Sequence, residues 1–392
     1  MVTFKGTNLF PLLRDSVPRW GKIYFSLTLT DKVTNVMRDA VEGNVVPFNL
    51  TDVRIEIRDP VSHILPGHQN LQIFIRSAPN LRRLSYRFIG GLLIFPISLE
   101  FIDKLPAERI GELQFPLVPF PDDRPLFRFL SNSCTSLRTL SLYALDTEPL
   151  AHGGGGIQMH GELHLPALET LILGPDSQFP KILPYLKLPS LKELVCSFQL
   201  HDRRGDRPGA TPNMLLEALE DMISRSQTTL HYFMCAFSNE DLVEVLASAV
   251  LEDVKHLVLM VEVGHAAIEM LGRPELGLHG TPGTGPMFLP QLEKFEMRVC
   301  DIEDGPGVSS MVQSRASLPD SMLRFVKVMF YGSGDRLFEK DMMLEVPGVQ
   351  LDFEVDENKP EWVDIPWFQG CRRTPKLIGD YLDRGKYAGI SS

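Results

Sequence analysis

The 392-residue sequence has few cysteines, no long hydrophobic run and no excess of positive charge. Its five cysteines are an odd and sparse set, which argues against a disulfide-stabilised scaffold. No stretch approaches the roughly 18 consecutive apolar residues of a membrane span. The first residues also lack the apolar core of a signal peptide. We therefore expect an intracellular protein, cytoplasmic or nuclear, without a membrane partner.

The net charge of −11 disfavours nucleic acid and anionic membrane surfaces as main partners. The hydrophobic content of 44% is that of a folded protein, so disorder is excluded as the general state of the chain. Composition thus leaves a folded protein whose expected partners are other proteins.

Motifs for catalysis or metal binding are missing as well. Three histidines (His152, His160 and His164) lie near a run of four glycines at 153–156. Those glycines disfavour the helix that a metal-binding pair at i and i+4 requires, and no Lys-Ser/Thr follows them to complete a phosphate loop. We predict no enzyme activity, no cofactor and no metal site. The remote alternative is an enzyme whose site lies in the inserted loops at 152–156, 201–212 and 272–286.

What the sequence does contain is a repeated phrase, apolar-x-x-apolar-x-apolar. Clear copies begin at Leu81, Leu137, Leu168 and Leu191. Looser copies begin at Trp20, Leu50, Ile110, Leu230, Val254, Leu292 and Leu323, and a last strand is expected at 349–355. The mean spacing of about 30 residues lies in the leucine-rich-repeat range. This pattern predicts a repeat array over 8–355, of about ten to eleven repeats, followed by a C-terminal cap or tail at 356–392.

The phrase has a direct structural interpretation. Its last three positions alternate, as in a β-strand, and one repeat alone cannot bury the apolar face, so successive strands must stack in parallel. Apolar stripes between the strands predict helices at 70–77, 126–132, 213–225 and 242–250. The expected fold is an α/β, irregular leucine-rich-repeat solenoid. Its parallel strands would form the concave face, and helices and extended segments the convex face.

The outward positions of the phrase are the candidate partner-binding residues. They change from polar to apolar along the array, and the set comprises Arg83, Arg87, Ile172, Val195, Met234, Val258 and Met260. An apolar centre with a polar rim is typical of protein interfaces. The alternative is that a loop or the C-terminal tail covers the apolar centre.

Two cysteines occupy the third apolar slot of consecutive repeats. Cys196 and Cys235 would therefore stack in neighbouring strands. We interpret them as reduced core residues, with a disulfide or a metal pair as the alternative.

The segments 78–84, 165–171 and 188–194, with the consecutive residues Arg19 and Trp20 before the first strand, carry a family resemblance. They resemble the leucine-rich-repeat region of F-box-like proteins from mushroom-forming fungi. The resemblance implies substrate recognition for a cullin-RING ubiquitin ligase, in which an N-terminal F-box docks the ligase adaptor. No F-box pattern is visible before Trp20, so adaptor binding is expected only where an F-box exists. A free-standing repeat scaffold without a ligase role is the alternative.

Overall fold

The computed structural model describes fourteen stretches of the 392 residues: 17–27, 42, 46–58, 72–89, 105–117, 124–144, 161–173, 182–197, 212–236, 239–272, 289–301, 305–318, 321–331 and 346–356. They fall into two compact units. The first contains the described residues up to 173 together with 185–190, and the second contains 182–184 and those from 191 onward. Apart from residue 356, which still belongs to the last strand, the expected tail at 356–392 lies outside the described residues, so its role as a cap or tail stays a prediction.

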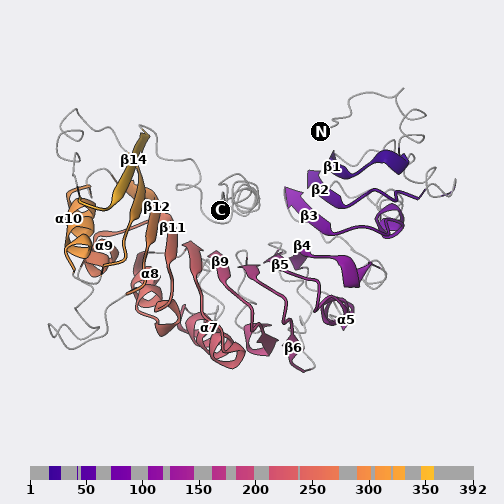
Figure 1. The fold of residues 1–392 in the computed structure, drawn as a ribbon, viewed down its shortest axis with the longest axis horizontal. Coiled ribbons are helices and arrows are strands. Elements are labelled where there is room, and N and C mark those ends of the chain that lie inside the picture. Colours follow the sequence, from indigo (N-terminus) through magenta and orange to yellow (C-terminus); the bar gives the residue numbers. More distant parts are fainter. Residues whose placement is uncertain are drawn as a thin grey trace, which may run out of the picture. The chain divides into compact units, whose positions relative to one another are not determined.

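The first unit is built on six parallel strands whose order follows the chain (Figure 1). They are β1 (Lys22–Leu27), β2 (Asp52–Arg58), β3 (Arg83–Ile89), β4 (Glu112–Leu117), β5 (Thr139–Ala144) and β7 (Thr170–Leu173). A separate two-stranded sheet pairs β6 (Leu163–His164) with β8 (Leu186–Lys187). Helical segments precede several strands: η1 (Val17–Arg19), residues 72–76, η2 (Ala107–Arg109) and α5 (Arg124–Asn132).

The second unit has six further parallel strands in chain order. They are β9 (Glu193–Ser197), β10 (Tyr232–Ala236), β11 (His256–Glu262), β12 (Lys294–Asp301), β13 (Phe325–Tyr331) and β14 (Gln350–Asp356). Its helices are η3 (Leu183–Tyr185, which begins in this unit), α7 (Pro212–Ser226), α8 (Asn239–Leu246), η4 (Ala249–Leu251), α9 (His265–Gly272) and α10 (Gly305–Ala316). In Figure 1, α7 to α10 lie on one side of these strands. The α/β class with parallel strands is confirmed.

Every copy of the repeated phrase forms a strand, and each strand begins two residues after the first apolar position. Leu81, for example, precedes β3, and Leu137 precedes β5. The first apolar residue therefore lies in the turn before the strand and not in the strand itself. Both Leu81 and Leu137 are fully buried, so this turn belongs to the core as much as the strand does.

Helical residues are present at all four expected places, although the helix expected at 242–250 is divided into α8, which ends at Leu246, and η4. In α7 the buried side chains recur every three or four residues, at Leu215, Ala218, Leu219 and Met222. This spacing places them on one side of the helix, against the strands. Between β7 and β9 the described residues contain only η3 and the short strand β8, as the prolines of that segment predicted.

Within each unit, a backbone ladder joins the entries of successive strands. In the first unit, the amides of Arg82 and Arg83 both donate to the carbonyl of Thr51, at 2.9 and 3.0 Å. The amides of Gly111 and Glu112 repeat this at the carbonyl of Arg82, at 2.8 and 3.1 Å. The same pair of bonds recurs in the second unit, for example from 255 and 256 to 231. The repeat is therefore a property of the main chain and not only of the apolar pattern.

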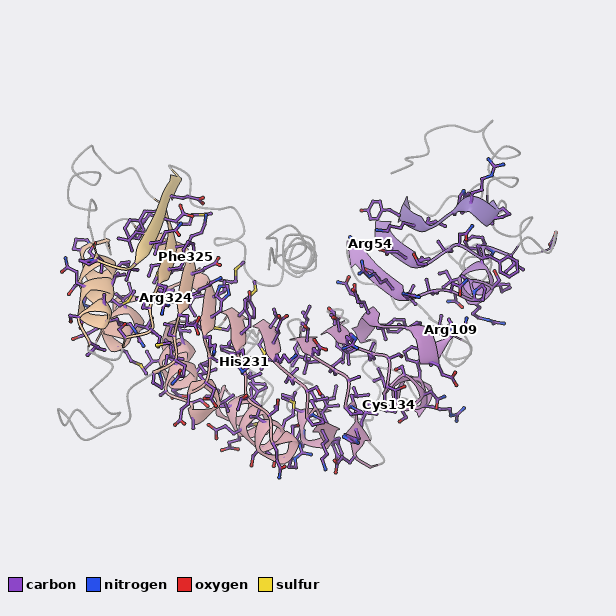
Figure 2. The ribbon with its side chains drawn as sticks, in the orientation of Figure 1. Arg54, Arg109, Cys134, His231, Arg324 and Phe325 are labelled. Atoms are coloured by element: carbon purple, nitrogen blue, oxygen red, sulfur yellow. The ribbon has the colours of Figure 1, made fainter. Side chains whose placement is uncertain are left out.

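Side chains reinforce this ladder at the third residue before a strand. Asn49 Nδ2 donates to the carbonyl of Pro18, and Asn80 Nδ2 donates to that of Phe48, both at 2.7 Å. Arg109, labelled in Figure 2, fills the same position before β4 and donates to the carbonyl of Pro79. In these three turns a side-chain donor of variable type thus ties the turn to the preceding turn.

The second unit holds a buried arginine. Arg315 on α10 donates from Nη1 to the carbonyl of Leu271 at 3.2 Å and from Nη2 to the carbonyl of Leu289 at 2.8 Å. Burial lowers the pKa of Arg315 to about 10. Close packing of the two helices accompanies this contact, since a Cβ at Gly272 would lie 3.1 Å from Met311 Cα. Arg315 therefore connects the end of α9 to the turn before β12.

Candidate protein-binding strand face

The strand face is defined here as the side of each set of strands that points away from the buried apolar core. Alternate strand residues reach it. In the first unit one row in register runs through Tyr24, Arg54, Ser85, Gln114, Ser141 and Ile172. In the second unit the corresponding row runs through Val195, Met234, Val258, Glu296, Lys327 and Asp352. Figure 2 labels Arg54 of the first row.

The charged residues of the first unit pair with each other across strands. Arg83 Nε lies 2.9 Å from Glu112 Oε1, and its Nη1 lies 3.9 Å from Asp52 Oδ2. Arg54 Nε lies 3.6 Å from the other oxygen of Asp52. The predicted binding residue Arg83 is therefore half-exposed but already placed between two carboxylates. Arg87 lies within β3, and its side chain is outside the described part of the structure.

Three polar side chains beside these ion pairs were not predicted from the sequence: Ser85, Gln114 and Ser141. Ser85 Oγ donates to Gln114 Oε1, whereas Gln114 Nε2 and Ser141 Oγ have no hydrogen-bond partner among the described residues. Gln114 and Ser141 are nevertheless 6% and 1% exposed. Such groups cost about 1–3 kcal/mol each when buried unpaired. Gln114 and Ser141 occupy the same outward position of the repeated phrase as Ile172. The sequence pattern therefore predicted where they lie, but not that they lack hydrogen-bond partners.

The predicted apolar centre is present but buried. Val195, Met234 and Val258 are in register on β9, β10 and β11, and each is at most 7% exposed. Ile172 belongs to the first unit and is fully buried. Met260 is half-buried and lies where the β11–β12 register shifts, so it falls outside the regular row. A binding role for these residues stays a prediction.

Polar and aromatic contacts surround this apolar row. The ring of Tyr232 packs edge-on against that of His256, with centroids 4.8 Å apart, and its hydroxyl lies 3.7 Å from Met234 Sδ. His256 Nε2 lies 3.0 Å from Glu296 Oε1 on the next strand. These side chains were not among the candidates, although His256 and Tyr232 occupy outward positions of the phrase.

Further along the same face, one lysine holds two carboxylates. Lys327 Nζ on β13 lies 3.0 Å from Asp352 Oδ2 and 2.6 Å from Glu354 Oε1, both on β14. The hydrogen bond to Glu354 is the main cause that raises the pKa of Lys327. The strand face of the second unit therefore changes from apolar at β9–β11 to charged at β12–β14.

No metal-binding arrangement is present in the described ranges, where no group of three or more histidine, cysteine or carboxylate side chains gathers. His164 is exposed on β6, whereas His152, His160 and the glycine run at 153–156 lie outside those ranges. No described helix is both long and apolar enough to cross a membrane.

Cys196 and Cys235 face each other in register on β9 and β10, as the phrase predicted. Both are free thiols in the core. Burial raises the pKa of each well above its ordinary value near 9, and for Cys196 the neighbouring Cys235 adds to the shift. A raised pKa disfavours the thiolate that metal binding and disulfide exchange require. The reduced-core interpretation therefore fits this pair.

Comparison with known proteins adds no assignment: no protein-family model matches the chain, and no curated protein matches its sequence.

Proposed function

We propose that this chain is a protein–protein recognition module, an irregular leucine-rich-repeat solenoid whose strand face binds a partner protein. The observation that carries the proposal is that the two sides of the strands differ in burial and in residue type. Inward positions such as Val53, Leu84 and Leu257 are almost completely buried. Outward positions form rows in register that carry charged, aromatic and hydroxyl side chains. Repeat proteins present their binding residues in this way.

The finer proposal is that the partner is a substrate of an F-box-type ubiquitin ligase. Its support is the resemblance of segments 78–84, 165–171 and 188–194 to fungal F-box-like proteins. Binding to a cullin-RING adaptor would need an F-box in addition to the repeat region. We expect the repeat region by itself to bind the substrate and not the adaptor.

Recognition by the strand face is tested with half-exposed and exposed side chains. An aspartate at Met234 or Val258 would bury a charge and unfold the site, because both residues are buried. We therefore choose Lys294→Glu on β12 and Phe325→Ala on β13, which are exposed and half-buried. Glu217→Ala, exposed on α7, is the control on the opposite side.

The tagged chain is purified from cells, its partners are identified by mass spectrometry, and one purified partner is titrated against each variant. We expect the two strand-face variants to weaken binding by about tenfold or more, and Glu217→Ala to leave it unchanged. Equal binding by all three variants would contradict recognition by the strand face. A tagged cullin adaptor is then added to test the ligase proposal. If a form of the protein that carries an F-box does not bind this adaptor, the free-standing scaffold is favoured.

A further inference from the structure

Two polar side chains on the strand face of the first unit lie next to each other without completing their hydrogen bonds. Gln114 on β4 and Ser141 on β5 are register partners. The strand neighbours of Gln114, Leu113 and Phe115, point into the core, and so does Leu140 beside Ser141. Gln114 and Ser141 therefore both point to the strand face.

Both free groups can donate a hydrogen bond: Gln114 Nε2 donates only, whereas the hydroxyl of Ser141 can donate or accept. Ser85 Oγ donates to Gln114 Oε1, which leaves the amide hydrogens of Gln114 Nε2 for another acceptor. Gln114 Nε2 and Ser141 Oγ have no partner among the described residues, although both atoms are buried. Buried polar groups in proteins are nearly always hydrogen-bonded. Two exceptions in register on adjacent strands therefore indicate a missing partner group.

Spacing and charge define the chemistry of that partner. Neighbouring strands lie about 4.8 Å apart, so one acceptor atom between Gln114 and Ser141 reaches both donors. Arg83, a cation on this face, is placed between Asp52 and Glu112, and the carboxylate of Glu112 lies two residues before Gln114. A negative ligand would meet that carboxylate, so the neutral carbonyl oxygen of an amide fits better than phosphate or carboxylate.

The exposure of the surrounding residues limits the shape of the ligand. Ser85, Glu112 and Thr139 are half-exposed, whereas Gln114 and Ser141 between them are buried. A narrow extended chain reaches such a position more easily than a helix, whose carbonyls are already bonded internally.

We propose that Gln114 and Ser141 bind a main-chain carbonyl of an extended peptide segment in the partner protein, with Gln114 Nε2 and Ser141 Oγ donating to the same oxygen. This inference rests on the proposed recognition function and names one contact point within it. The ion pairs of Arg83 with Asp52 and Glu112 form one border of the site.

Two near-isosteric variants test the site. Gln114→Met and Ser141→Ala remove the donors and change the shape of the side chains little. The donors that these changes remove are unpaired in the free protein, so Ser141→Ala should not lower the thermal midpoint of unfolding. Gln114→Met also removes the Oε1 acceptor of Ser85 Oγ, but Ser85 is half-exposed and can bond water instead, so we expect at most a small decrease in that midpoint. Thr139→Val, on the same strand and face as Ser141, is the matched control that removes a half-exposed hydroxyl.

The probe is a displayed library of random peptides of about 12 residues, selected on the unmodified chain. Synthetic copies of the selected peptides are then titrated against each variant. We expect Gln114→Met and Ser141→Ala each to weaken binding about tenfold or more, and Thr139→Val to have little effect. The side-chain amide resonances of Gln114 should shift when peptide is added to 15N-glutamine-labelled protein. Replacement of one peptide carbonyl by a thioamide should weaken binding to the unmodified chain more than binding to Ser141→Ala, which keeps only the Gln114 donor.

The proposal fails if no selected peptide loses affinity in these variants, or if the Gln114 resonances do not move. It also fails if a crystal structure with peptide shows only a water molecule between the two side chains. If Lys294→Glu and Phe325→Ala weaken a partner that Gln114→Met and Ser141→Ala do not affect, this contact is wrong and the recognition function stands. If all four leave binding unchanged, both are wrong.

Discussion

His256 Nε2 on β11 lies 3.0 Å from Glu296 Oε1 on β12, so a histidine and a carboxylate meet across two register-paired strands. Their side chains are 26% and 14% exposed, which reduces solvent screening of the pair.

The first prediction concerns this pair. A double-mutant cycle with His256→Ala and Glu296→Ala should give a coupling free energy of about 0.5–1 kcal/mol, because each single change removes the same contact between β11 and β12. Urea unfolding of the four proteins measures this coupling. A coupling near zero would show that the contact does not contribute to stability.

The second prediction concerns the paired thiols. Burial holds the pKa values of Cys196 and Cys235 above their ordinary value near 9, so the native state keeps protons that the unfolded chain releases. The thiols therefore support folding below about pH 9, and the free energy of unfolding should fall as the pH rises above it. A Cys196→Ala/Cys235→Ala variant should show a smaller fall above this pH.

Alkylation provides an independent check of the same thiols. Iodoacetamide should label the half-buried Cys134 faster than Cys196 or Cys235 in the native protein, and all three at similar rates after unfolding. Rapid native labelling of Cys196 or Cys235 would show that this part of the core opens readily.

The third prediction concerns Arg315. Arg315→Met removes both hydrogen bonds to the carbonyls of Leu271 and Leu289 and leaves these buried groups without their donor. We expect a loss of about 1–3 kcal/mol in the free energy of unfolding, somewhat offset because methionine carries no charge to bury. Gln313→Ala, exposed on the same helix, should change it by less than about 0.5 kcal/mol. Urea unfolding measures the free energy of unfolding of both variants. If Arg315→Met is more stable than the unmodified protein, the desolvation of the buried charge costs more free energy than its two hydrogen bonds contribute.

The fourth prediction concerns the side chains that tie successive turns together. Asn80→Ala should lower the free energy of unfolding by about 1 kcal/mol, because the hydrogen bond from its Nδ2 to the carbonyl of Phe48 is lost. Arg82→Ala, an exposed neighbour in the same turn, is the control and should have little effect. Chemical denaturation would detect the difference, and equal effects would show that the ladder depends on the main chain alone.

The sequence predicted the strands better than the helices, for a physical reason. Each strand carries its apolar alternation within six residues, as at Leu81 to Tyr86, and this local signal is sufficient. The helix α10 was not predicted, because Gly305, Pro306 and Gly307 at its start favour a loop and buried Arg315 interrupts its apolar stripe. Its formation depends on packing against α9, which a local pattern does not contain.

The candidate site was predicted only as a set of positions. The outward offset correctly placed Val195, Met234 and Val258 in one row. It did not indicate that they are buried, or that Arg83 is placed between carboxylates of two other strands. Burial and pairing depend on residues about 30 positions away and on the register, so neither follows from one repeat.

The backbone ladder at the strand entries has a consequence for how this kind of chain changes during evolution. Its bonds join main-chain amides to main-chain carbonyls, so most substitutions at these positions leave them intact. The side chains and lengths of such repeats can therefore diverge until related proteins retain little sequence identity. Proline is the exception, since it removes the amide donor. The absence of proline at the two amides before each strand should therefore persist longer among related proteins than the leucines of the repeated phrase.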